Sequence, residues 1–332
     1  MKNILIISDG IPGHYNQSKG TVTLLSESFE VHSTIHEMKW RFHALRSVIT
    51  IISRLLLKTE SMFSAKCILW LYGPVCIFEY DLIVAAGGNT APFCAALRML
   101  HGKPLIQLGS PRGMQVKLFS ALVTVERYFD DPANVVAVLT PNLYSPKICS
   151  IESENANMHK HLFFLIGGKG IGYSYDESEW ILLIDRIIEL NAKTQLPITL
   201  VTSRRTNPAV EKLLKKSLSS LLSNQSAFFH EGAHNFNLSG LLGSAEFIFV
   251  TEDSAMMITE SISSGKPVST IFPASINSPA RYENHLQKYA DLTLMTRQPI
   301  CDFDLQVMEN QTKKINHHRE DLKNTLVQRI GW

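Results

Sequence analysis

The 332-residue sequence predicts an α/β fold built from two doubly wound domains. Short runs rich in Val, Ile and Leu alternate with helical stretches, as in a parallel sheet covered on both faces. The alternation starts again near residue 161, and the first apolar run of each half ends in a glycine turn, GIPG and then GGKG. Hydrophobic residues (45%) and charged residues (19%) occur in the proportions of a packed globular chain.

The first domain is expected to span residues 1–150. Its strands are predicted, from the apolar runs, at 3–8, 31–36, 81–86, 104–109 and 121–125. The helices between them are predicted at 15–29, 41–58, 62–78 and 89–101. The polar, weakly patterned stretch 145–161 is expected to be a linker or a long surface loop.

The second domain is expected to span residues 160–300. Strands are predicted at 161–168, 198–203, 227–230, 247–254 and 267–272. Helices are predicted at 177–193, 208–222, from the end of the fourth strand to Ser264, and near 280–290. A last helix is predicted within 304–332. Two such domains that face one another across a cleft would each bind one ligand.

Composition excludes several classes of function. The net charge is +2, so no global field favours nucleic acid. Five scattered cysteines, without CxxC spacing, predict reduced thiols and a cytoplasmic protein. The run at the N-terminus breaks at Asp9 and is too short for a signal peptide. No uncharged window reaches the roughly 18–20 residues of a membrane span.

The stretch from Lys39 to Lys66 has an unusual charge pattern. It holds six basic residues and one acidic residue, Glu60, and the apolar run VITIISRLLL lies between them. Basic residues beside large apolar ones are typical of a helix lying in an anionic membrane surface, here within 41–78. A buried helix pair with snorkelling basic ends explains the pattern equally well.

The strongest local pattern is FIFVTEDSAMMITESISSGKPV at 247–268. A strand ends, Thr251 to Ser254 form a turn, and a helix follows whose free N–H groups suit a phosphate. The hydroxyls of Thr251 and Ser254 would add donors, and Glu260 would accept hydrogen bonds from ribose. An ordinary capped crossover helix is the alternative.

Three further turns of the second half follow predicted strands. TSRRT (202–206) offers two adjacent arginines, which suit a diphosphate because a guanidinium pairs with phosphate oxygens in a fork. LIGGKG (165–170) lets the backbone approach a ligand. HEGAHNFNLSGLL (230–242) falls where a base or sugar would rest, although the spacing of its histidines is poor evidence for a metal.

The first half has its own turns at strand ends. SDGIPGHYNQSKG (8–20), AAGGNTAP (85–92) and LGSPRG (108–113) should line one edge of the sheet, where open α/β sheets bind ligands. His14 is the only imidazole among these turns, and an ordinary histidine is suited to act as a base near neutral pH. Arg112 could hold an anionic acceptor. A purely structural role for His14 is the alternative.

The segments DGIPGHYNQ, LIGGKG, TSRRT and VTEDSAMMITESISSGKPV together resemble the family known for the plant "elongate mitochondria" fission protein. Some bacterial members are described as glycosyltransferases of the lipooligosaccharide outer core. The order and spacing agree from residue 9 to about 268. The chain departs from the family at 235–237, where Asn-Pro-Tyr is common, and in the acidic segment at 126–136. These departures bear on the sugar and the acceptor more than on the fold.

The resemblance implies a GT-B-like glycosyltransferase with two Rossmann-like domains. Such enzymes bind a nucleotide sugar in the C-terminal domain and the acceptor in the N-terminal domain, and their last helix packs back on the first domain. They generally need no metal, and no cofactor is expected because the nucleotide sugar is a substrate. A lipid-linked or lipooligosaccharide acceptor would place the protein in the cytoplasm, peripherally on the inner membrane.

Each predicted site residue receives a role from this resemblance. His14 or Asp9 would be the catalytic base. The donor would be bound by Gly167, Gly168, Ser203, Arg204, Arg205, Asn235, Thr251, Glu252, Asp253, Ser254, Met257 and Glu260. The acceptor side would hold Gly13, Asn16, Gln17, Gly88, Asn89 and Arg112. Two alternatives remain open, a nucleotide-sugar epimerase and a non-catalytic membrane-surface protein.

Overall fold

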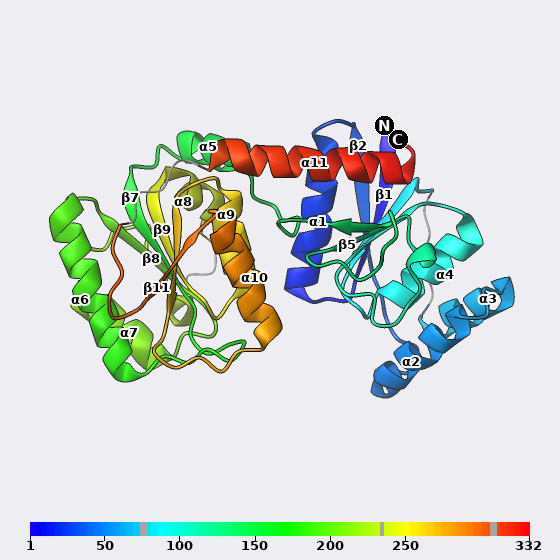
Figure 1. The fold of residues 1–332 in the computed structure, drawn as a ribbon, viewed down its shortest axis with the longest axis horizontal. Coiled ribbons are helices and arrows are strands. Elements are labelled where there is room, and N and C mark those ends of the chain that lie inside the picture. Colours follow the sequence, from blue (N-terminus) through cyan, green and yellow to red (C-terminus); the bar gives the residue numbers. More distant parts are fainter. Residues whose placement is uncertain (74–78, 233–235, 306–310) are drawn as a thin grey trace. The chain divides into compact units, whose positions relative to one another are not determined.

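The computed structural model describes residues 1–73, 79–232, 236–305 and 311–332. Within these residues the chain divides into two compact units (Figure 1). The first comprises Met1–Leu143 and His317–Trp332, and the second comprises Tyr144–Asn316. Each unit has one parallel sheet with helices packed on it, so the predicted fold class is confirmed.

The first unit has a six-stranded parallel sheet in the order β2-β1-β3-β4-β5-β6. Its strands are β1 (Lys2–Ser8), β2 (Val31–Glu37), β3 (Leu82–Ala86), β4 (Leu105–Leu108), β5 (Ala121–Thr124) and β6 (Asn134–Val136). Its helices are α1 (Pro12–Ser26), α2 (Arg46–Leu57), α3 (Met62–Leu71) and α4 (Ala91–His101), with short 3₁₀ turns η1 (His43–Leu45) and η2 (Val116–Leu118). Five of these strands match the predictions closely, while the three-residue β6 was not predicted.

Alternating residues of the strands serve two cores, as the pleat of a strand requires. Leu5 and Ile83 point to the face that α2, α3 and α4 cover. Ile4 and Val84 point to the opposite face, where they pack with α1 and with the end of α11 (Thr312–Ile330). Arg319 of α11 donates to a carboxylate at the end of α1 at 2.6 Å. The C-terminal helix thus packs on the first unit from His317 onward.

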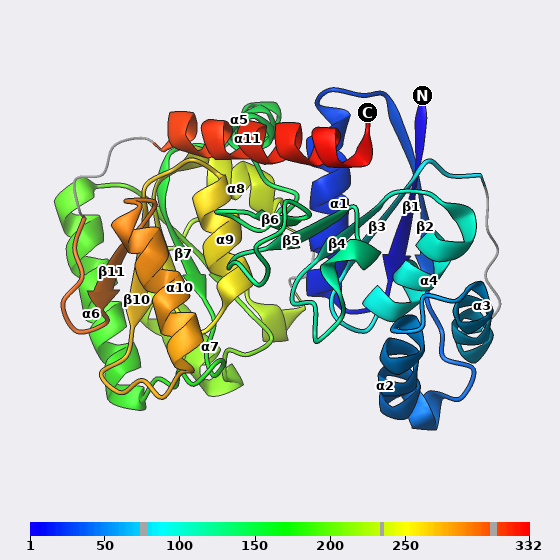
Figure 2. The same ribbon diagram turned by 45° about the vertical axis from the view of Figure 1, so that its right-hand side comes forward.

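Helices α2 and α3 pack against each other and against α4 (Figure 2). Their inner faces combine large apolar core residues such as Ile49, Leu57 and Ile68 with small or polar ones such as Thr50 and Ser53. A second set of large apolar side chains on both helices points outward, so a buried helix pair explains the inner faces of this region but not the outer ones. The described part of α3 ends at Leu71, and residues 74–78 lie outside the described residues. No helix in the described residues is long and apolar enough to cross a membrane.

The second unit has a five-stranded parallel sheet in the order β11-β10-β9-β7-β8. Its strands are β7 (His161–Ile166), β8 (Ile198–Thr202), β9 (Ala245–Thr251), β10 (Val268–Phe272) and β11 (Thr296–Pro299). Its helices are α5 (Pro146–Asn155), α6 (Glu177–Thr194), α7 (Pro208–Leu218), α8 (Leu238–Ser244), α9 (Ala255–Ser263) and α10 (Ala280–Asp291), with the 3₁₀ turn η3 (Phe229–Glu231). Phe164 and Phe249 stack at 4.8 Å between ring centroids and join the core under α6 and α7.

Two predictions in this unit were wrong. The stretch expected to be a linker forms α5, which begins at the N-cap Ser145 and packs on α8. The expected strand at 227–230 makes only a single bridge through Ala227 before a 3₁₀ turn. In both places packing against neighbouring elements decided the structure, because the local sequence pattern was weak.

Candidate functional site

The order of the strands identifies one edge of each sheet as a ligand site. In open α/β sheets, ligands bind at the carboxyl ends of the two neighbouring strands whose connections leave in opposite directions. In the first unit these strands are β1 and β3, because β1 lies between β2 and β3. In the second unit they are β7 and β9. Four of the turns singled out in the sequence follow these strands, and the turns LGSPRG and TSRRT follow the adjacent strands β4 and β8.

The turn after β1 is shorter than predicted. Helix α1 begins at Pro12, so Gly13, His14, Asn16 and Gln17 lie on its first two turns and not on a loop. No side chain caps this helix, and its N-cap is Ile11. The correction follows from proline, which is favoured in the first turn of a helix because it has no N–H group to satisfy. His14 and Gln17 are three residues apart and share one face of the helix.

Asp9 and His14 form a hydrogen-bonded pair at the edge of the first sheet. Nδ1 of His14 lies 3.1 Å from both carboxylate oxygens of Asp9. The Asp9 side chain is fully buried, while the His14 side chain is 30% exposed. Asn89 donates to Oδ2 of Asp9 at 3.3 Å and connects the turn after β3 to the pair. Burial alone would raise the pKa of Asp9, but the hydrogen bond and the charge of His14 lower it overall.

Two glycines after β3 have no side chain, and the space above them is filled by His14 and Arg112. A Cβ atom on Gly87 would lie 2.3 Å from the His14 ring, so the ring rests directly on this glycine. A Cβ atom on Gly88 would lie 2.5 Å from Nε of Arg112. Arg112 comes from the turn after β4, and the carbonyl oxygen of Gly88 accepts a hydrogen bond from Arg54 of α2 at 3.1 Å. Asp9, His14, Gly88, Asn89 and Arg112 are therefore brought together, as predicted.

Arg54 is a member of this group that the sequence analysis missed. It lies in the apolar run of α2, far in sequence from the turns at the sheet edge. A helical wheel of α2 gives the signal that could have found it, because Thr50, Ser53 and Arg54 form a polar stripe in an otherwise apolar helix.

In the second unit, the turns after β7, β8 and β9 meet through buried polar contacts. Thr251 Oγ1 accepts from the backbone N–H of Gly167 at 2.7 Å and donates to Asp253 at 2.7 Å. Asp253 accepts from Arg205 at 2.9 Å. A Cβ atom on Gly167 would lie 2.1 Å from the Asp253 carboxylate, so only glycine fits there. Thr251 and Asp253 are fully buried and hold the turns together.

The turn after β8 presents one paired and one exposed arginine. Ser203 Oγ accepts from the backbone N–H of Arg205 at 3.2 Å, which closes the turn. The carbonyl oxygen of Arg205 lies against Gly168, where a Cβ atom would be 2.1 Å away. Arg204 is exposed and has no acidic partner among the described residues. This edge thus carries a neutral Arg205–Asp253 pair and a separate exposed cation.

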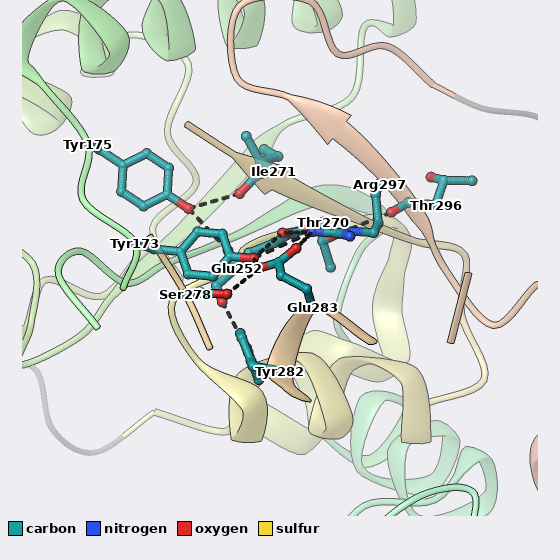
Figure 3. A network of polar contacts seen from close by, with 10 residues as sticks. All are labelled: Tyr173, Tyr175, Glu252, Thr270, Ile271, Ser278, Tyr282, Glu283, Thr296 and Arg297. Atoms are coloured by element: carbon teal, nitrogen blue, oxygen red, sulfur yellow. Dashed lines mark hydrogen bonds and ion pairs between the residues drawn. The ribbon is translucent and has the colours of Figure 1, made fainter. Parts of the chain in front are cut away.

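Glu252 lies in a second buried network, drawn in Figure 3. Arg297 of β11 donates to it at 2.8 and 2.6 Å, and also reaches Glu283 of α10 at 2.8 Å. Thr270 donates at 2.6 Å and Tyr173 at 2.9 Å. The Glu252 side chain is fully buried, and its oxygens are occupied by these partners. Its observed role is to connect β9, β10, β11 and α10.

The start of α9 lies directly after this turn. Ser254 is the N-cap, and its Oγ accepts from the backbone N–H of Met257 at 3.5 Å. The Met257 sulfur lies 3.8 Å from Nη2 of Arg205. Glu260 has no hydrogen bond or ion pair to another described residue, and burial raises the pKa of its carboxyl group to about 7. A carboxyl group so placed gains a great deal from a hydrogen-bond donor.

A cavity of about 800 Å³ borders the same edge of the second sheet. It is lined by the turns after β7 and β8 and by the starts of α6 and α7, including Gly168, Arg204, Arg205, Trp180 and His230. Its lining includes no residue of α9. The ring of His230 is held by the carbonyl oxygen of Thr206 at 2.9 Å, which indicates a structural role.

Two observations complete the site. Asn235, which was predicted to hold a base or sugar, and His234 lie outside the described residues. Within the described residues, no group of three or more His, Cys, Asp or Glu side chains could hold a metal ion.

Comparison with known proteins adds a family. The model of the family "Mitochondrial fission ELM1" matches residues 12–320. An uncharacterised protein of Rickettsia prowazekii is 25% identical over 137 residues, which is 41% of this chain and 38% of that protein's length. The chain thus matches less than half of this curated relative.

Three solved structures are similar over nearly the whole chain. The UDP-GlcNAc 2-epimerase of Methanocaldococcus jannaschii has 14% identity and a TM-score of 0.49, with 98% of this chain and 93% of that one covered. The ADP-heptose heptosyltransferase II of E. coli has 12% identity and a TM-score of 0.44, with 99% of both chains covered. The E. coli heptosyltransferase WaaC, with an ADP-heptose analogue, has 12% identity and a TM-score of 0.46, with 97% and 99% covered.

Proposed function

The chain belongs to the mitochondrial fission ELM1 family, and on this premise we propose that it is a glycosyltransferase. It would move a sugar from a nucleotide-sugar donor to a lipid-linked or lipooligosaccharide acceptor. The second unit would bind the donor, and the first unit would bind and deprotonate the acceptor. The observation that carries the proposal is the Asp9–His14 pair at the ligand edge of the first sheet.

The pair has the parts of a general base. Nδ1 of His14 donates its proton to the buried Asp9 carboxylate, which leaves Nε2 to accept a proton from an acceptor hydroxyl. The freed oxygen attacks the anomeric carbon, the bond from that carbon to the diphosphate breaks, and the nucleoside diphosphate leaves with the bonding electrons. The negative charge of Asp9 stabilises the imidazolium that forms. Asn89 and Gly87 hold the carboxylate and the ring in place.

The second unit offers groups that suit a nucleoside diphosphate. The N-terminus of α9 would favour an anion because it is the positive end of the helix dipole, and Gly167 and Gly168 would let the ligand come close to the backbone. Arg204 is an exposed cation, and Arg205 could turn from Asp253 toward an entering diphosphate because its side chain is partly exposed. Glu260 would accept hydrogen bonds from the ribose hydroxyls, and Asn235 would contact the base or sugar. Thr251, Glu252 and Asp253 would act by positioning these groups.

The acceptor's membrane origin is supported by α2 and α3. Val48, Ile51, Ile52 and Leu55 form one stripe on α2 and are 42–56% exposed. Met62, Phe63 and Trp70 extend it along α3, with Phe63 75% exposed. We define these seven side chains as the apolar stripe. An apolar surface of this kind on a soluble unit marks a contact with a partner or a membrane.

Charge decides which occupant fits the apolar stripe. Arg41, Arg46, Lys58 and Lys66 surround it, and the acid of this stretch, Glu60, is neutralised by Lys117. Arg41 lies 4.8 Å from the Trp70 ring centre, as expected of side chains at a membrane interface. An anionic bilayer matches apolar side chains rimmed by cations. The protein would therefore sit on a cytoplasmic membrane surface and take its acceptor from there.

The test is sugar transfer by the full chain. Labelled nucleotide sugars would be supplied as a panel together with glycolipids extracted from bacterial membranes. The proposal expects labelled sugar on a glycolipid and an equal amount of released nucleoside diphosphate, both lost in His14→Gln. An isomerised sugar without glycolipid product would favour an epimerase. No turnover with any donor and lipid acceptor would overturn the proposal.

A further inference from the structure

Arg54 is a partly buried cation that has no acidic partner among the described residues. Its Nη2 donates to the carbonyl oxygen of Gly88 at 3.1 Å, and its Nε is buried without a hydrogen-bond partner. Arg186, Arg205 and Arg297, which are also partly buried, each contact a carboxylate, whereas Arg98 donates to the hydroxyl of Ser120. An unpaired buried charge is costly, so Arg54 has a capacity for an anion that the described residues leave unused.

Arg112 adds a second cation to the same place. Its side chain crosses Gly88, where a Cβ atom would lie 2.5 Å from Arg112 Nε and 2.6 Å from Cδ. The backbone of Arg112 has a φ of +46°, in the left-handed region that non-glycine residues rarely adopt. Such local strain is often found where a side chain has to be held for a ligand. Burial and the charge of Arg112 both lower the pKa of Arg54, which agrees with two guanidinium groups placed close together.

The acids nearby are already engaged. Asp9 accepts from His14 and Asn89, and Glu60 pairs with Lys117. No carboxylate of the described residues contacts Arg54 or Arg112. Both arginines contact Gly88, and the next residue, Asn89, is hydrogen-bonded to Asp9. The two arginines therefore lie close to the Asp9–His14 pair.

We propose that Arg54 and Arg112 bind a phosphate group of the acceptor, beside the Asp9–His14 pair. This rests on the proposed function only in naming the ligand as the acceptor. Two guanidinium forks can pair with the oxygens of one phosphate, and their two positive charges balance a phosphate dianion. The site would hold the phosphate while His14 takes the proton of a hydroxyl on the same molecule.

Helix α2 favours a phosphate that is attached to a lipid. Arg54 leaves α2 on the side of Thr50 and Ser53, whereas the apolar stripe occupies the outward side of the same helix. A lipid whose tail stays in the membrane would bring its head group to about the depth of this helix. A phosphate on a sugar of the acceptor has the same chemistry, and the experiment separates the two sources.

Binding of three phosphate ligands to the full chain tests the proposal by titration calorimetry. Geranyl phosphate represents a lipid phosphate, glucosamine 1-phosphate a sugar phosphate, and inorganic phosphate the group alone, with geraniol as the uncharged counterpart. We expect geranyl phosphate to bind most tightly, and at least tenfold more tightly than geraniol. Arg54→Gln and Arg112→Gln should each weaken phosphate binding at least tenfold, and Arg112→Lys should weaken it less.

Arg127→Gln is the matched control, because Arg127 is an exposed arginine of the same unit, paired with Asp130, and should leave binding unchanged. Thermal unfolding checks that each variant is folded, and Arg112→Gln preserves the bond between Arg54 and Gly88. Tighter binding of glucosamine 1-phosphate would place the phosphate on a sugar. The proposal is overturned if no phosphate ligand binds, or if the variants bind as the wild type does.

The two proposals can fail separately. Arginine-dependent phosphate binding without any sugar transfer would contradict only the transferase. Sugar transfer that continues in Arg54→Gln and Arg112→Gln, with an unchanged KM for the glycolipid, would contradict only the phosphate site.

Discussion

The ligand edges of the two sheets differ in how their charged side chains are paired. In the second unit the two buried carboxylates of the turn after β9 are paired, Asp253 with Arg205 and Glu252 with Arg297. In the first unit Asp9 is paired with an imidazole, and Arg54 and Arg112 have no acid among the described residues. The second edge is therefore held together by its own ion pairs, whereas the first leaves a base and two cations to be completed by a ligand.

The largest effect on stability is expected when an ion pair at the ligand edge of the second sheet is broken. Arg297→Gln leaves Glu252 and Glu283 without their cation, and removing one partner of a buried pair costs about 3–5 kcal/mol. Denaturant unfolding measures the loss. Arg127→Gln, which breaks an exposed pair, should cost less than ~1 kcal/mol. Equal small losses would mean that the network in Figure 3 does not hold this edge together.

At the ligand edge of the first sheet, a large effect is expected on the rate of sugar transfer. His14→Gln removes the proton acceptor, and positioned acid–base groups contribute roughly 10²–10⁴-fold to rate. The kcat for sugar transfer should fall by about that factor. His32→Gln changes an exposed histidine of β2 and serves as the control, with an unchanged kcat. A His14→Gln enzyme of normal activity would mean that His14 has only a structural role.

The sequence predicted the parts of the fold that depend on local apolar runs. It did not predict β11, because Thr296–Pro299 reads as a polar stretch whose Arg297 and Gln298 find their partners only in the folded unit. The turns with Asp9 and His14 were recognised because both residues lie within six positions of one strand end. Arg54 was missed because its approach to Gly88 depends on how α2 packs. Likewise, the buried pairing of Glu252 follows from the neighbouring strands.

The two units should also differ in how much they contribute to membrane binding. Ile51→Asn with Leu55→Asn places two polar side chains in the apolar stripe, and each lost apolar side chain removes up to about 1.5–3 kcal/mol of burial in lipid. Flotation with vesicles rich in anionic lipid should show at least tenfold weaker binding. The control is Ile181→Asn with Ile188→Asn on α6, two apolar residues of similar exposure in the second unit. Equal losses in both variants would argue against α2 as the contact.

A smaller effect is expected at Glu260. Its pKa of about 7 in the folded chain lies above the ordinary value of 4.5, so the folded state keeps a proton that the unfolded state loses. Its contribution to stability is therefore present below about pH 4.5 and is lost as the pH rises through 7. Glu260→Gln should nearly match the wild type at pH 4.5 and exceed it by ~3 kcal/mol at pH 8, because each unit of pKa shift corresponds to about 1.4 kcal/mol.

The same carboxyl group gives a binding test. UDP and ADP should bind the wild type more tightly as the pH rises from 6 to 8, beyond any change seen with Glu260→Gln, because an ionised carboxylate accepts hydrogen bonds from ribose. A pH dependence that is identical in the two proteins would exclude Glu260 from the ribose site.

The affinity of UDP and ADP for His14→Gln tests the division of labour between the units most directly. Titration of the full chain would give both affinities for wild type and variant. Because the donor groups belong to the second unit, the account predicts affinities within about twofold of the wild type while transfer is lost, and a large loss of affinity in Arg204→Gln with Arg205→Gln. An affinity that falls in His14→Gln as far as the rate does would contradict it.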